Sequence, residues 1–69
     1  MNTTTKQSNY DFTFTEQGKN EEQAYIIGFS CDSDLKALAL FNKLVEGLKP
    51  IKAELIKNEQ ATIAHWGEQ

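Results

Sequence analysis

The sequence predicts a small α+β domain in two layers, with the order β-β-α-β-β and one amphipathic helix packed on a four-stranded antiparallel sheet. Two segments before residue 32 and two after residue 50 show the period of two that is typical of strands. The segment between them has apolar residues at helical spacing. Polar clusters separate the two members of each strand pair, which favours two hairpins.

The first hairpin is predicted between residues 10 and 31. The segment YDFTFTEQ alternates strictly, with Tyr10, Phe12 and Phe14 on one side, and GKNEE then supplies turn-forming residues. The next segment, QAYIIGFSC, is rich in β-forming residues and is apolar on both faces. Because a strand buried on both faces lies inside a sheet, this pattern predicts a central strand. Its two faces carry Tyr25, Ile27 and Phe29 on one side and Ala24, Ile26 and Gly28 on the other.

A helix is predicted over residues 34–49, because its apolar residues share one face at 100° per residue. Pro50 prevents its continuation. Asp32 or Ser33 is the expected N-cap, since Asp and Ser are preferred there and an acidic first turn complements the helix dipole. The predicted apolar face contains Ala37, Leu38, Phe41, Leu44, Val45 and Leu48.

Residues 51–66 are ambiguous between a hairpin and a second helix. As strands, Ile51, Ala53 and Leu55 share a face, and the polar KNEQ makes the turn before ATIAHW. As a helix, Pro50 fits the first helical position, but Glu59 then falls within the apolar stripe. We prefer the hairpin, and the β-β-α-α order is the alternative.

The chain has the size of one domain, which we assign to residues 9–69. Residues 1–8 carry no apolar side chain after Met1 and are predicted to be a disordered tail. A domain this short buries only about 60% of its extended surface, so its stability is marginal. A well-packed core or oligomerisation is expected to stabilise it.

Composition restricts the classes of partner. The net charge is −3, and all seven basic residues are scattered lysines. Without arginine or a clustered basic face, nucleic acid is disfavoured as a partner. The chain contains no apolar stretch long enough to span a membrane, and its single cysteine fits a reducing compartment. We expect a cytoplasmic protein that does not bind membranes.

Cys31 is the first candidate for chemistry, since it precedes a helix start. The neighbouring Asp32 and Asp34 repel a thiolate, and the only possible base is His65. We therefore expect Cys31 to be a small apolar residue at a strand end. The sequence also offers no metal-ligand spacing and no phosphate-binding loop, so we expect no catalytic residue, metal or cofactor.

These observations favour a small acidic non-enzymatic protein that binds another protein, as a regulator, inhibitor or accessory subunit. One helix covers only one face of the sheet, which motivates a homodimer or a docked partner. The candidate interface residues are Ala24, Ile26, Gly28 and Trp66. The alternative is single-stranded nucleic-acid binding, which requires outward-facing aromatic residues. These residues are Tyr10, Phe12, Phe14, Tyr25 and Phe29.

Overall fold

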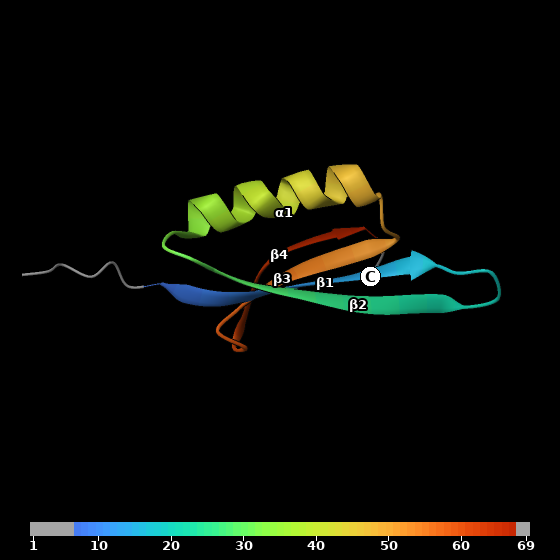
Figure 1. The fold of residues 1–69 in the computed structure, drawn as a ribbon, viewed down its shortest axis with the longest axis horizontal. Coiled ribbons are helices and arrows are strands. Elements are labelled where there is room, and N and C mark those ends of the chain that lie inside the picture. The colour runs from blue at the N-terminus through green and yellow to red at the C-terminus, as the bar shows by residue number, and fades with distance from the viewer. Residues whose placement is uncertain (1–6, 68–69) are drawn as a thin grey trace, which may run out of the picture.

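The computed structural model describes residues 7–67, which form one sheet and one helix (Figure 1). The strands are β1 (Ser8–Gln17), β2 (Glu22–Cys31), β3 (Lys52–Lys57) and β4 (Ala61–Gly67), and the helix is α1 (Asp34–Leu48). The helix lies along one face of the sheet (Figure 1). The predicted two-layer α+β fold and its element order are confirmed, and the β-β-α-α alternative is wrong.

The strand order in the sheet is β2-β1-β3-β4, and every neighbouring pair is antiparallel. The two strands that flank β1 therefore run in the same direction, and α1 is the crossover between them. β2 lies at an edge, so the prediction of a central strand is wrong. Its apolar residues on both faces suggested burial, but β3 occupies the other side of β1.

The core lies between β1, β3 and α1. Phe12 and Leu55 are fully buried, and Phe41 of the helix packs edge-on against the Phe12 ring with a centroid distance of 5.6 Å. Ala37 and Ala53 let the helix approach the sheet closely. As predicted, the alternate residues of β1 that begin with Tyr10 face this core.

Both ends of α1 are fixed by local groups. The N-cap is Ser33, whose Oγ accepts the Lys36 N–H at 3.1 Å. Asp32 instead forms an ion pair with Lys36 at 3.1 Å. At the other end, Lys49 adopts φ 50° and donates its N–H to the Val45 carbonyl, directly before Pro50.

The second hairpin follows the helix, as the period-two reading predicted. Asn58 and Glu59 both have positive φ and form its turn. β4 carries one extra residue, Ile63, between the pairs Ile56↔Thr62 and Leu55↔Ala64. This bulge bends the strand at the second edge of the sheet.

Ser8, the last residue of the predicted tail, already belongs to β1, where it pairs with Cys31. Residues 1–6 of the predicted tail, and residues 68–69 of the predicted domain, lie outside the described residues.

Replacement of the central aromatic residue tests this packing. Phe12→Ala removes a ring that contacts both Phe14 and Phe41, so the free energy of unfolding should fall by about 3–5 kcal/mol. Leu35→Ala is the control, because Leu35 is 80% exposed and its loss should cost less than about 0.5 kcal/mol. Urea unfolding followed by Trp66 fluorescence measures both. Equal destabilisation by the two variants would contradict this core assignment.

Candidate functional site

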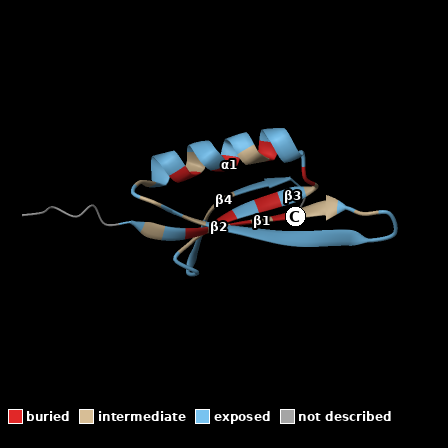
Figure 2. Cartoon of the chain, in the orientation of Figure 1, coloured by how far each residue is buried: buried red, intermediate tan, exposed pale blue. Residues whose placement is uncertain are grey.

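β2 is the least covered element of the fold. Every residue from Glu22 to Gly28 is exposed, whereas β1 buries each alternate residue (Figure 2). On the helix side, Tyr25 and Ile27 are each 41% exposed, and on the far side Ile26 is 70% exposed. The helix leaves residues 22–28 of β2 uncovered, so this part of the strand presents apolar side chains to solvent on both faces, whereas Phe29 and Cys31 pack against the core.

The outer edge of β2 also presents backbone groups that no other strand of the described residues 7–67 pairs. On the opposite side of β1, Ile51 N–H donates to Thr15 O at 2.8 Å, and Asn58 N–H donates to Asn9 O at 2.6 Å. Because backbone groups alternate along a strand, odd residues of β1 bond towards β3 and even residues bond towards β2. The register then leaves alternate residues of β2 with their N–H and C=O groups pointing outward. These residues are Glu22, Ala24, Ile26, Gly28 and Ser30.

Natural proteins protect such an edge with charges, proline, bulges or very short strands. β2 is ten residues long, and it has no charged residue or proline after Glu22. Its register with β1 runs without a shift from Ser8↔Cys31 to Gln17↔Glu22. Within the described residues 7–67, no strand pairs with the outer edge of β2. This edge is therefore long, regular, apolar and unprotected.

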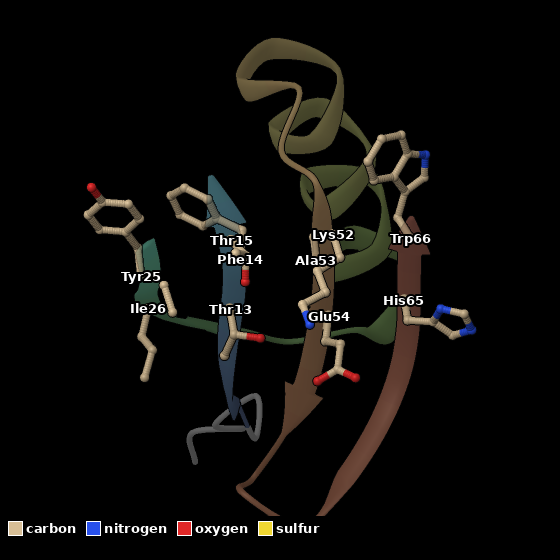
Figure 3. Close-up of a pocket in the computed structure, with 11 residues that line it drawn as sticks. Thr13, Phe14, Thr15, Tyr25, Ile26, Lys52, Ala53, Glu54, His65 and Trp66 are labelled. Carbon is tan, nitrogen blue, oxygen red and sulfur yellow. The ribbon is translucent and has the colours of Figure 1, made fainter. Parts of the chain in front are cut away.

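A hollow of about 550 Å³ extends over the sheet, and Figure 3 shows that all four strands contribute to its lining. Cross-strand pairing places four of its residues in one row on the face opposite the helix. This row consists of Ile26, Thr13, Glu54 and His65. The far face of the sheet is thus a mixed polar and apolar surface that continues directly into β2.

The predicted interface residues divide between two places. Ala24, Ile26 and Gly28 lie together on the far face of β2, with outward backbone groups. Trp66 is 45% exposed and also lines the hollow, but it lies on β4 at the opposite edge. Its pairing with the buried Ala53 puts its side chain on the helix side. The four residues therefore do not form one continuous patch.

Cys31 and His65 lie on strands at opposite edges of the sheet, about 14 Å apart in strand spacing alone. The Cys31 thiol, which is partly buried, instead donates a weak hydrogen bond to Ser33 O at 3.5 Å. Asp32 and Ser33 serve the start of the helix. These positions provide no thiol–imidazole pair for nucleophilic catalysis.

A polar cluster that the sequence did not predict ties the helix start to the sheet. The buried Tyr10 donates its hydroxyl to Asp34 Oδ1 at 2.7 Å, and Lys57 Nζ lies 3.0 Å from the same oxygen. The hydrogen bond from Tyr10, followed by that from Lys57, lowers the pKa of the Asp34 carboxyl from 3.8. Hydrogen bonding to Asp34, with burial second, raises the pKa of Tyr10 to about 12. These contacts hold the first turn of α1 in place over β1 and β3.

Within the part of the chain that the structure describes, no group of three or more His, Cys, Asp or Glu side chains is placed to hold a metal ion. No helix among residues 7–67 is long and apolar enough to cross a membrane. Comparisons with protein-family models, curated proteins and solved structures found no match to this chain.

The burial of the aromatic residues bears on the nucleic-acid alternative. Tyr10, Phe12 and Phe14 are at most 8% exposed, and they stack on one another or on β2 rings beneath the helix. Base stacking requires an open ring face. Among the proposed platform residues only Tyr25 is substantially exposed, so the structure offers this alternative no aromatic platform.

The Tyr10–Asp34 contact predicts a two-sided pH dependence of stability. The lowered pKa of Asp34 stabilises the folded state above about pH 3.8, and this contribution is lost as the pH falls through the folded-state pKa. The raised pKa of Tyr10 stabilises the folded state below pH 10.0, and this is lost as the pH rises towards about 12. Tyr10→Phe should lower the melting temperature at neutral pH. It should also make the fall of the melting temperature smaller at both acid and alkaline pH.

Tyr25→Phe is the matched control, because the Tyr25 hydroxyl donates to the side chain of Gln23, which is itself exposed, and does not contact Asp34. It should keep the wild-type pH profile. Thermal unfolding followed by circular dichroism between pH 2 and 12 measures all three proteins. A Tyr10→Phe profile that is parallel to the wild type at both extremes would contradict the role of the cluster.

Proposed function

We propose that this chain is a small acidic, non-enzymatic protein of the cytoplasm. It acts by binding another protein, as a regulator, inhibitor or accessory subunit, and it works as a homodimer. The observation that carries the proposal is β2, a ten-residue strand with apolar side chains on both faces and an outer edge that no strand among residues 7–67 pairs. Such a strand is a template for pairing with another chain.

The energetics support association. Exposed apolar surface contributes roughly 25 cal/mol per Å² when it is buried, and Tyr25, Ile26 and Ile27 are the largest apolar side chains of β2 left in water. The strand is already ordered by its pairing with β1, so binding at its edge costs little further backbone entropy. The edge of β2 is already ordered, is apolar and has outward backbone groups that can bond another chain. These properties favour a role in protein binding over a role in catalysis.

The mass of the chain in solution tests the homodimer. Light scattering at tens of micromolar should give twice the monomer mass of 7.8 kDa. Ile26→Lys should weaken dimerisation about tenfold or more, because it adds a charge to an apolar contact. Leu35→Lys is the matched control, since Leu35 is 80% exposed on the helix and should leave the mass unchanged. A monomer mass for the wild type would overturn the homodimer.

The reactivity of the single cysteine tests the absence of thiol-dependent catalysis. Because Cys31 is partly buried, lies beside Asp32 and has no imidazole nearby, it should react with iodoacetamide no faster than an ordinary protein thiol. Mass spectrometry of the alkylated chain measures this rate, with glutathione as the reference. Reaction much faster than glutathione at neutral pH would contradict a non-enzymatic role.

A further inference from the structure

We propose that β2 pairs antiparallel with β2 of a second copy, about a two-fold axis that passes through the Ile26 pair. This inference rests on the proposed homodimer, since it names the surface and the register by which the two copies meet. The two four-stranded sheets then become one continuous sheet, with a helix on each half. β2 becomes the central strand that its composition predicts.

The backbone favours this register over its neighbours. The outward-pointing groups of β2 occur at alternate residues from Glu22 to Ser30, and Ile26 is the middle one. With the axis at Ile26, Ala24 pairs with Gly28 of the second copy, and Glu22 pairs with Ser30. Each outward N–H and C=O in this range then has a partner. A shift in either direction leaves outward groups unpaired at one end of both strands.

The side chains agree with the same register. On the helix side, Tyr25 lies opposite Ile27 of the second copy, twice by symmetry, and each is 41% exposed in the single chain. Aromatic and β-branched residues are favourable cross-strand pairs, and they approach most closely at positions without hydrogen bonds. On the far side, the 70% exposed Ile26 meets its own copy. The exposed apolar residues Tyr25, Ile26 and Ile27 therefore all lie next to the two-fold axis.

The charges permit this contact. Glu22 is the only charged residue of β2, and it lies at the start of the strand. In this register it faces Ser30 of the second copy, so two like charges do not oppose each other. Although the chain has a net charge of −3, no charged side chain of β2 therefore lies at the centre of the contact.

The second edge of the sheet explains why the assembly stops at two copies. β4 contains the Ile63 bulge, which interrupts its regular pairing, and it has seven residues rather than ten. A bulged edge is a poor template for another strand. With one pairing edge per chain, a symmetric contact closes into a dimer and does not extend into a fibre.

Disulfide cross-linking of single-cysteine variants tests the register. In a Cys31→Ser background, Ile26→Cys should form a covalent dimer under mild oxidation, because its Cα atoms would lie about 5.5 Å apart across the axis. Ala24→Cys and Gly28→Cys, each alone, would place their thiols about 14 Å from their own copies along the strand. Neither should cross-link alone, but their equimolar mixture should. Non-reducing electrophoresis, with reversal by dithiothreitol, measures the products.

The outcomes separate this inference from the proposed function. Cross-linking of Ile26→Cys and of the mixture supports the register. Cross-linking of Ala24→Cys or Gly28→Cys alone, with a dimer mass, places the axis elsewhere and overturns it. A dimer mass without any β2 cross-link also overturns it and leaves the homodimer intact. A monomer mass for both the Cys31→Ser parent and the wild type overturns both proposals.

Discussion

A single helix is too narrow to cover a four-stranded sheet, and this constraint governs the rest of the structure. An α-helix with its side chains is about 10 Å wide, whereas four strands at about 4.8 Å spacing present a broader surface. The helix packs its small and aromatic residues, Ala37 and Phe41, on the centre of the sheet. Part of the outer sheet then remains uncovered, and the longest such stretch is residues 22–28 of β2.

The cluster of Tyr10, Asp34 and Lys57 helps to decide which part of the sheet the helix covers. It joins the first turn of α1 to β1 and β3, while Ser33 caps the same turn. The helix is thereby held over the centre of the sheet at its start. β2 directly precedes the helix in the chain, but the helix does not lie over its apolar residues from Ala24 to Ile27. These residues remain in contact with water.

The sequence predicted the local features of the fold because these depend on short-range patterns. Periods of two and 3.6 and Pro50 after the helix predicted the first three elements. Residues 51–66 fitted both a hairpin and a helix, and the polar turn near Asn58 favoured the hairpin that the structure shows. Strand order is different, because it depends on which distant segments pair. No local signal shows that β3, and not another neighbour, occupies the second side of β1. The contact of Tyr10 with Asp34 spans 24 positions, so residue patterns could not reveal it either.

The residues of the candidate site were predictable only where they follow a pattern along one strand. The residues Ala24, Ile26 and Gly28 were found from their apolar pattern, and they lie together on β2. Trp66 was chosen for its residue type alone, and it lies at the other edge. A pattern along one strand carries information about that strand's surroundings, whereas an isolated tryptophan does not specify its neighbours.

The one incorrect strand assignment is also the most informative. Residues 22–31 have the composition of a strand buried on both faces, yet the single chain leaves residues 22–28 exposed. A sequence that agrees with its fold at the other elements but conflicts at one segment points to a functional surface there. Pairing with a second copy reduces the conflict, because β2 would then occupy a central position in the joined sheet and its exposed side chains would gain cross-strand neighbours. The discrepancy between pattern and burial is therefore itself an argument that this chain is completed by association.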